Sequence, residues 1–429
     1  MSRLVPVAAG AAACLLLFGV GFAGAASAPK VVLVSRCAGS NAEPEQAVAG
    51  HYVYEAWIGC QGIGFARSVN GGKKFGASHV VPSTGHLWDP DVAVGPDGTV
   101  YVSYMLGSLV PTSGGTLAEM TPAVAVSTNH GQSFARVSLL PVPLPTTADG
   151  NWGDRDFIAV APDGTVYVTW DYGPSESEVK TLCDPTGSCA FSNGDFNAVV
   201  QKSTDGGKTW TMPAPVSPGF PLGGACSAPI VVEPNGSLGV LYWGHSTNPS
   251  TLAVGPGTEY FTSSSDGGTT WSSPVAVDPT AGTIAQPTWW IDGSLAVDPS
   301  GALYATWDTQ TGTSDTGWVA WSNDGGKSWS PAMRVTSGSS ERLVQVTAAK
   351  AGSIYVGWQT PTKGYGTYLR RLAVGQGWTG RTKKLSNKWG SRGTWPGDTI
   401  GLSTSGGTAI VSWGSSGKIY ATRTALPAH

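Results

Sequence analysis

Acidic residues and tryptophans stand side by side at four points of the sequence. These segments are Trp88-Asp89-Pro90-Asp91, Trp152-Gly153-Asp154-Arg155-Asp156, Trp289-Trp290-Ile291-Asp292 and Trp395-Pro396-Gly397-Asp398. The face of an indole ring stacks on the C–H surface of a sugar, and a carboxylate accepts hydrogen bonds from sugar hydroxyl groups. If the fold brings these segments together, we expect them to bind carbohydrate.

Glycoside hydrolysis needs two carboxyl groups, one that protonates the leaving oxygen and one that activates water or attacks the sugar. The candidate catalytic residues, which would pair between the first two segments, are Asp89, Asp91, Asp154 and Asp156. The candidate substrate-binding residues are Trp88, Trp152, Arg155, Trp289, Trp290, Asp292, Arg342, Trp395 and Asp398. The alternative is a structural role, in which the acids cap strand ends and the tryptophans fill crossovers.

The sequence predicts no cofactor, with calcium as the one open possibility. The segment from Asp149 to Asp154 has oxygen ligands at spacings that a Ca²⁺ loop can use, but it lacks a bidentate glutamate twelve positions on. The histidines have no zinc-binding spacing, and the chain contains no nucleophile elbow, phosphate-binding loop or dinucleotide fingerprint.

One eight-residue unit, Ser-x-Asp-x-Gly-x-x-Trp, recurs along the chain. Full copies end at Trp210, Trp271 and Trp329, and weaker copies end at Phe75 and Phe134. We expect the acidic or amide side chain to accept backbone N–H groups, the glycine to adopt a positive φ, and the aromatic ring to fill the gap between neighbouring sheets. The residues assigned to this structural role are Asn70, Asn129, Asp205, Trp210, Asp266, Trp271, Asp324 and Trp329.

A second unit precedes each of these boxes: an apolar strand, a turn of the Pro-Asp-Gly type, and a strand that ends in a large aromatic residue. The seven aromatic residues are Trp57, Tyr104, Trp170, Tyr242, Trp307, Trp358 and Trp413. They recur roughly every 59 residues, which is enough for one four-stranded blade. In the second repeat the expected strands are Asp91–Val94, Val100–Tyr104, Ala123–Ser127 and Phe134–Leu139.

The fold class predicted from this repeat is all-β, a β-propeller of seven four-stranded blades. The last repeat has only three strands, Ile400–Leu402, Ala409–Trp413 and Lys418–Arg423, and the segment Val31–Ser35 can supply its fourth. That pairing closes the ring and covers a sheet edge. A propeller of six blades with an accessory hairpin is the alternative.

The short turns and the boxes lie on one face of such a propeller, so the longer connections lie on the other. They include loops expected at Gly107–Met120, Gly173–Asn197 and His245–Thr258. The innermost strands begin on this same face, around the central channel. The acidic segments, together with Glu45, are therefore predicted to surround one mouth of the channel.

Residues 1–28 have the apolar centre and small-residue end of a secretory signal peptide, and residues 29–429 are expected to form a single domain. Secretion is the expected localisation, with an uncleaved membrane anchor as the alternative.

Export permits disulfides, and we expect Cys37 to pair with Cys60 and Cys183 with Cys189, which leaves Cys226. The net charge of −3 gives no basic surface for nucleic acid. We expect a monomer without membrane contact beyond the leader.

Asp boxes placed between the third and fourth strands resemble those of the sialidase-like (BNR/Asp-box repeat) β-propeller superfamily. The resemblance covers nearly all of the chain after the leader, and it implies the fold rather than an activity. Sialidases of this superfamily usually have six blades, and seven blades occur in endoglucanase-like and non-catalytic relatives. The resemblance would imply an arginine triad, a Phe-Arg-Ile-Pro motif and a Tyr–Glu pair in a strict exo-sialidase. The motif and an assignable pair are missing, and only Arg155, Arg342 and Arg392 are candidates for the triad.

The function expected from the sequence is that of a secreted sialidase-like propeller that recognises extracellular or cell-wall glycans. Glycoside hydrolysis is the reaction if the protein is an enzyme. The alternative is a non-catalytic scaffold that docks or assembles proteins, so the expected partner is a carbohydrate or a surface protein. An open mouth with inward-pointing acids favours the first function, and a filled mouth with an apolar patch on the loops favours the second.

Overall fold

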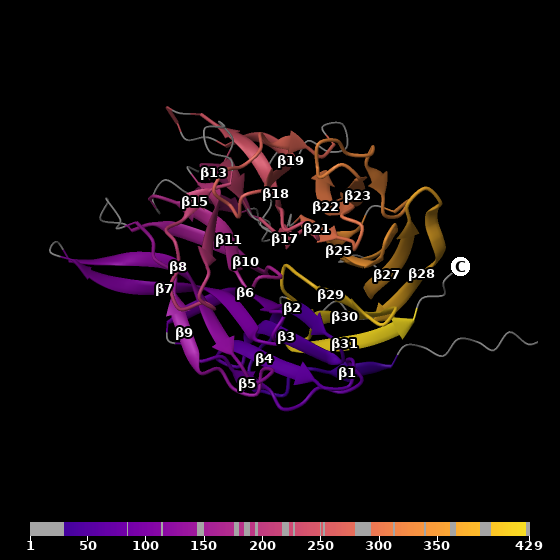
Figure 1. Ribbon diagram of the computed structural model, residues 1–429, viewed down its shortest axis with the longest axis horizontal. Helices are drawn as coiled ribbons and strands as arrows, with labels where there is room; N and C mark the ends of the chain where they lie inside the picture. The colour runs from indigo at the N-terminus through magenta and orange to yellow at the C-terminus, as the bar shows by residue number, and fades with distance from the viewer. Residues whose placement is uncertain are drawn as a thin grey trace, which may run out of the picture.

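The computed structural model describes residues 30–83, 85–112, 115–143, 150–175, 180–183, 189–193, 196–216, 223–225, 228–248, 250–251, 254–278, 293–311, 314–338, 340–360, 366–386 and 396–425. The regular elements in these ranges are all β-strands. Seven antiparallel sheets stand radially around a central axis (Figure 1). The prediction of a seven-bladed propeller is confirmed, and the six-bladed alternative is wrong. Within the same ranges, no helix has the length and apolar character needed to cross a bilayer.

The strands of each blade follow one another from the axis outward. Blade 1 consists of β2(Ala42–Ala49), β3(Tyr52–Gly59), β4(Gly62–Ser68) and β5(His79–Val80). Blade 2 consists of β6(His86–Val94), β7(Val100–Thr112), β8(Gly115–Ser127) and β9(Arg136–Leu139). Blade 3 consists of β10(Trp152–Val160), β11(Val166–Gly173), β14(Asn197–Ser203) and β15(Ala214–Pro215). Blade 4 consists of β17(Ile230–Val232), β18(Leu238–Thr247), β19(Val254–Ser264) and β20(Val275–Ala276), and β16(Gly223–Ala225) also pairs with β18. Blade 5 consists of β21(Ser294–Val297), β22(Leu303–Thr311), β23(Ser314–Ser322) and β24(Met333–Arg334). Blade 6 consists of β25(Arg342–Lys350), β26(Ser353–Thr360), β27(Gly366–Ala373) and β28(Gly377–Ser386). Blade 7 consists of β29(Gly401–Ser405), β30(Thr408–Ser415), β31(Lys418–Ala425) and β1(Val31–Leu33).

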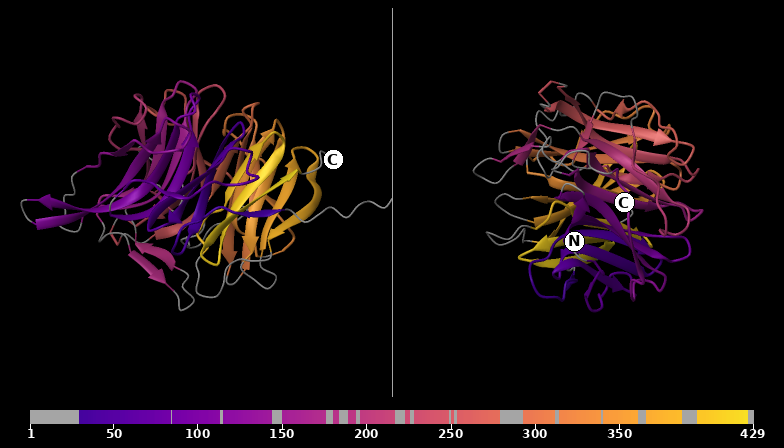
Figure 2. Two further views of the ribbon diagram at one scale, coloured as in Figure 1. Left: turned by 90° about the horizontal axis from the view of Figure 1, so that it is seen from below. Right: turned by 90° about the vertical axis from the view of Figure 1, so that its left-hand side faces the viewer.

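The connection from Gly107 to Met120 is not the loop that the sequence suggested. Strands β7 and β8 stay paired out to Thr112 and Gly115, so the segment is a long hairpin that extends beyond the body of the propeller (Figure 2, left). The two arms satisfy each other's peptide groups, which an irregular loop would have to leave to water. The insert of blade 3 likewise contains a hairpin, β12(Lys180–Cys183) with β13(Cys189–Asn193).

The apolar interior is divided among seven clusters, one at each contact between neighbouring blades. The repeated aromatic residue of the second strand packs against the preceding blade each time. Trp307 of blade 5, for example, packs against Leu241 and Phe261 of blade 4. All seven of these side chains are at most 2% exposed. The repeat seen in the sequence is therefore the repeat of the interblade packing.

The Asp boxes form the turns between the third and fourth strands. In blade 3, Asp205 Oδ1 accepts the backbone N–H groups of Lys208 and Thr209 at 3.0 Å each, and Gly207 has a φ of 78°. The Thr209 hydroxyl also donates to Asp205 Oδ2 at 2.7 Å, and this bond, with the backbone bonds, holds the pKa of Asp205 well below its usual range. Trp210, at the end of the box, packs into the cluster between blades 2 and 3.

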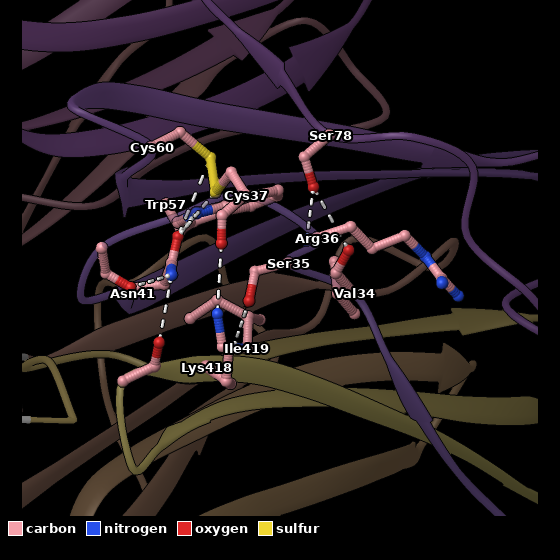
Figure 3. Close-up of a disulfide and its surroundings, with 12 residues drawn as sticks. Val34, Ser35, Arg36, Cys37, Asn41, Trp57, Cys60, Ser78, Lys418 and Ile419 are labelled. Atoms are coloured by element: carbon pink, nitrogen blue, oxygen red, sulfur yellow. Dashed lines mark hydrogen bonds between the residues drawn. A yellow bond between two sulfur atoms is a disulfide. The ribbon is translucent and has the colours of Figure 1, made fainter.

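The ring closes because the N-terminal strand completes the last blade. Strand β1 pairs antiparallel with β31, with Val31 opposite Thr422 and Leu33 opposite Tyr420, as the sequence predicts. The chain then crosses to blade 1, where the predicted disulfide between Cys37 and Cys60 is present (Figure 3).

Asn41 ties the two ends of the chain together beside this disulfide. Its side-chain oxygen accepts the indole N–H of Trp57 at 2.7 Å, and its amide nitrogen donates to the Gly417 carbonyl at 3.0 Å (Figure 3). The register of β12 and β13 places Cys183 opposite Cys189. Their side chains, Cys226 and the leader lie outside the described residues.

Truncating one interblade aromatic residue should loosen the ring. Trp307→Ala is expected to lower the free energy of unfolding by about 3–5 kcal/mol, because it leaves a cavity between blades 4 and 5. Urea denaturation followed by circular dichroism measures this loss. Met212→Ala is the control, since Met212 is 49% exposed and its truncation should cost about 0.5 kcal/mol or less. Equal losses in both variants would contradict the packing argument.

Candidate functional site

The innermost strands begin with the same irregularity in four blades. The register of the first two strands shifts at Ala42/Glu45, Trp88/Asp91, Asp154/Phe157 and Arg342/Gln345. At each shift one non-glycine residue has a positive φ, namely Glu43 (58°), Asp89 (45°), Arg155 (50°) and Leu343 (54°). Such bulges redirect side chains and recur beside binding sites.

In blade 7 a glycine occupies the corresponding position. Gly397 has a φ of 104°, and a Cβ atom there would lie 2.1 Å from the backbone nitrogen of Glu43. The chain of blade 7 therefore passes directly against blade 1, which brings the neighbouring Asp398 close to the bulge residues.

Arg155 connects four blades through these residues. Its guanidinium group lies 2.8 Å from Glu43 Oε1 of blade 1, 3.0 Å from Asp398 Oδ2 of blade 7 and 3.9 Å from Asp89 Oδ1 of blade 2. Its backbone N–H also donates to Asp89 Oδ2 at 3.1 Å. We call these four residues the Arg155 cluster. The side chains of Arg155 and Glu43 are 6% and 1% exposed, whereas those of Asp89 and Asp398 are 12% and 14% exposed.

The Arg155 cluster fills this part of the channel. A cavity of only about 10 Å³ remains among Glu43, Glu45, Asp89, Arg155 and Asp156, which is room for one water molecule. Among these described residues there is no room for a sugar. A ligand of sugar size has to lie on top of the cluster, against the partly exposed Asp89 and Asp398.

Asp156 lines this small cavity, and its buried carboxyl group could accept further hydrogen bonds there. The residue is 3% exposed, and neither carboxyl oxygen has a hydrogen-bond partner among the described residues. Burial, together with the nearby charges of Asp89 and Asp91, raises the pKa of Asp156 well above its usual range. An orphaned acid of this kind indicates that a water molecule or a ligand hydroxyl group completes the site.

Asp154 joins Asp89 and Trp88 at the edge of the mouth. The indole N–H of Trp88 donates to Asp154 Oδ1 at 2.7 Å. Burial raises the pKa of Asp154 well above its usual range, and the Asp89 carboxyl, which contacts it directly, raises it further. The two like charges repel each other, which favours the protonated form of Asp154. Asp91, with a pKa that burial raises to about 6, lies directly behind them.

A second group of acids lies in blades 4 to 6. Arg342 Nε donates to Asp315 Oδ2 at 2.7 Å, and Asp308 and Glu259 are close enough to influence one another's charge. Glu259 and Asp308 are 1% and 0% exposed, and none of their carboxyl oxygens has a hydrogen-bond partner among the described residues. We call these four residues the Arg342 cluster. Burial raises the pKa of Glu259 to about 8.

The structure thus divides the predicted site residues. It brings Trp88, Asp89, Asp154, Arg155 and Asp398 together, with Asp91 and Asp156 behind them, and it places Arg342 in the other cluster. Trp152 packs within blade 3, with its ring 5.1 Å from that of Phe196. Four predicted residues lie outside the described residues: Trp289, Trp290, Asp292 and Trp395.

In the segment considered for calcium, Asn151 and Asp154 make hydrogen bonds within the protein, and Asp149 lies outside the described residues. The Asn151 side chain is bound at both ends to Met120, accepting its N–H at 3.0 Å and donating to its carbonyl at 2.7 Å. Asp154 accepts the indole of Trp88. In the ranges that the structure covers, no three histidine, cysteine or acidic residues are grouped closely enough to hold a metal.

Sequence reasoning missed Glu43, Glu259 and Asp308. A signal for Glu43 was present, because Glu43-Pro44-Glu45 repeats the acid-Pro-acid pattern of Asp89-Pro90-Asp91 one blade earlier. Asp308 follows Trp307 as Asp171 follows Trp170. Glu259 sits within an ordinary strand, and no local pattern distinguishes it.

Comparisons with known proteins agree with this architecture. Residues 201–212, which include the Asp box of blade 3, match the BNR/Asp-box repeat family. An intramolecular trans-sialidase from Ruminococcus gnavus, solved with oseltamivir carboxylate, is 13% identical and superimposes with a TM-score of 0.51, covering 80% of this chain and 94% of that chain. No curated protein sequence matches significantly.

Two further solved structures are similar. An ulvan lyase from a new family of polysaccharide lyases is 12% identical with a TM-score of 0.57, over 92% of this chain and 94% of that one. A Hadza microbial sialidase is 14% identical with a TM-score of 0.50, over 87% and 77%. The fold and the repeats together make this chain a seven-bladed β-propeller with Asp boxes, similar in fold to sialidases. At such low identities the likeness concerns the fold, so an activity depends on the residues of the site.

The buried acids make stability depend on pH. Burial raises the pKa values of Glu55 and Glu259 from 4.5 to about 8. The folded protein therefore holds protons that the unfolded chain releases between these values. This stabilisation is complete below about pH 4.5 and is lost as the pH rises through about 8. We expect a lower melting temperature at pH 8.5 than at pH 5.

Glu259→Gln should make that drop smaller, because the amide does not titrate. Asp97→Asn is the control, since hydrogen bonds from Thr99 lower the pKa of this exposed aspartate and it stays ionised throughout the range. Melting curves of the three proteins at the two pH values measure the effect. A drop of the same size in Glu259→Gln as in the wild type would show that Glu259 does not titrate there.

Proposed function

We propose that this propeller recognises glycans at the mouth of its channel, on the surface formed by Trp88, Asp89, Asp154 and Asp398. The observation that carries the proposal is the contact of Trp88 with Asp154 and of Asp154 with Asp89. It sets a fixed, partly exposed indole ring beside carboxyl groups that can accept hydrogen bonds. A sugar needs this combination of an apolar platform and polar partners.

Two further observations support a ligand at this place. The bulges direct acids from separate blades toward one point, although each such backbone conformation costs free energy. The orphaned oxygens of Asp156 beneath that point leave hydrogen bonds to be made. The solved structures with a similar fold include sialidases and a polysaccharide lyase, so this scaffold carries glycan chemistry elsewhere.

The geometry favours recognition over hydrolysis. Retaining and inverting glycosidases hold their two carboxyl groups roughly 5–9 Å apart, because sugar or water has to fit between them. Asp89 and Asp154 contact each other directly, and Asp89 is also held by Arg155. Two carboxyl groups in direct contact leave no room between them for the anomeric carbon.

The proposal is tested on a glycan array with the full-length protein. Trp88→Ala and Asp154→Asn should each lower the affinity for the retained glycan by about tenfold or more, because one removes the platform and the other the carboxyl group. Asp163→Asn is the control: this exposed turn residue belongs to the same blade as Asp154 but lies at the opposite end of the strand pair.

Melting curves confirm that the variants fold. Unchanged affinity in Trp88→Ala and Asp154→Asn would place the glycan elsewhere. If the wild type retains no glycan, the result supports the alternative function of a scaffold that docks proteins. The projecting hairpin of β7 and β8 is then the first surface to test for a protein contact (Figure 2).

We also propose that the protein is exported. The Cys37–Cys60 disulfide supports this localisation, because such bonds persist in oxidising compartments. N-terminal sequencing of the protein from an expressing culture is the test. A first residue at or shortly before Pro29 in the medium is expected. An intact Met1 in the membrane fraction would support the anchor instead.

A further inference from the structure

The described residues around the mouth carry a large excess of acid. Their titratable groups are Glu43, Glu45, Asp89, Asp91, Asp154, Asp156 and Asp398, with Arg155 among these acids and His86 at the edge, its ring 5.3 Å from that of Trp88. The acids oppose one another: the charges of Asp91 and Glu43 act on Glu45, and that of Asp89 acts on both Asp154 and Asp156. A ligand that brings another negative charge adds to this repulsion.

Arg155 is not available to offset that repulsion. Its guanidinium group is already divided among Glu43, Asp89 and Asp398, and its side chain is 6% exposed. If the carboxylate of a sugar took its place beside Arg155, one of these protein carboxylates would be left buried without a partner. That exchange is costly because a buried unpaired charge is poorly solvated. In the other cluster, Arg342 pairs with Asp315 at 2.7 Å, and its side chain is 20% exposed.

The groups that do face the ligand are acceptors of hydrogen bonds and partners for cations. Asp89 and Asp398 are the more exposed members of the Arg155 cluster, at 12% and 14%, and Asp154 lies partly exposed beside Trp88. Carboxyl groups bind sugar hydroxyls through charge-assisted hydrogen bonds, and they bind an ammonium group more strongly still. The indole face of Trp88 also favours a cation.

We propose that the mouth selects sugars that carry no negative charge and binds amino sugars, with their protonated amine against Asp89, Asp154 and Asp398, more tightly than neutral ones. This inference rests on the proposed function, because it names the class of glycan that the same site accepts. Uronates, sialosides and sulfated sugars are excluded by the acids of the mouth.

Three β-1,4-linked tetrasaccharides with the same ring stereochemistry separate these classes: those of glucosamine, glucose and glucuronate. They are compared on the full-length protein, near pH 6 and at low salt, within an array that also contains sialosides and sulfated glycans. We expect the amino sugar to bind about tenfold more tightly than its neutral counterpart. The glucuronate should not be retained. The advantage of the amino sugar should shrink as salt is raised, because screening weakens the charge interaction.

Asp398→Asn tests the role of the acids directly. The substitution removes one negative charge and breaks the ion pair between Asp398 and the Arg155 guanidinium group. The affinity ratio of the amino sugar to the neutral sugar should therefore become smaller, and the glucuronate should bind weakly. Asp163→Asn is the matched control and should leave the ranking unchanged.

The possible results separate the two proposals. Retention of anionic glycans as strongly as of their neutral counterparts overturns the selectivity but leaves glycan recognition standing. Equal binding of glucosamine and glucose tetrasaccharides at every salt concentration also overturns it. Retention of no glycan at all overturns recognition and selectivity together.

Discussion

The sheets of this protein have two faces each, and in the described part of the chain only the neighbouring sheets cover them. Every blade therefore depends on the blades beside it, and a gap at any contact would expose the aromatic residues that fill it. The seventh contact, between the first and last blades, cannot be made by consecutive repeats. It exists because β1 joins β31 and because Asn41 and the Cys37–Cys60 disulfide hold the N-terminal segment against blade 1 (Figure 3). Closure of the ring is thus the condition for burying the core.

Closure also creates the site. When seven blades surround one axis, the first residues of the innermost strands converge, and the bulges direct Glu43, Asp89 and Arg155 toward one point. Like charges would make this convergence unfavourable. Arg155 offsets part of the repulsion by pairing with three carboxylates, and burial raises the pKa values of others such as Asp154 and Asp156. The centre of the ring is stable because of this shared neutralisation.

The ion pairs of Arg155 also decide which groups remain for a ligand. Because Arg155 is committed to the protein's own acids and is only 6% exposed, this part of the mouth offers a ligand carboxyl groups and an indole ring. Related scaffolds act on sugars in other ways with the same architecture, so the identity of the central side chains decides what the propeller can bind. The contact between Asp89 and Asp154 illustrates this point, since it suits hydrogen bonding to a sugar better than attack on it.

The sequence by itself determined the architecture. The seven aromatic residues, the Asp boxes and the orphan strand at Val31–Leu33 are local patterns, and each depends only on residues a few positions apart or on their regular recurrence. The tertiary structure alone decided which side chains meet. Glu43 and Arg155 are separated by 112 positions, and they touch only because the ring returns them to the same axis. The pairing of β7 with β8 beyond the blade and the protonation of buried acids such as Glu259 likewise follow from contacts and burial, which no short stretch of sequence encodes.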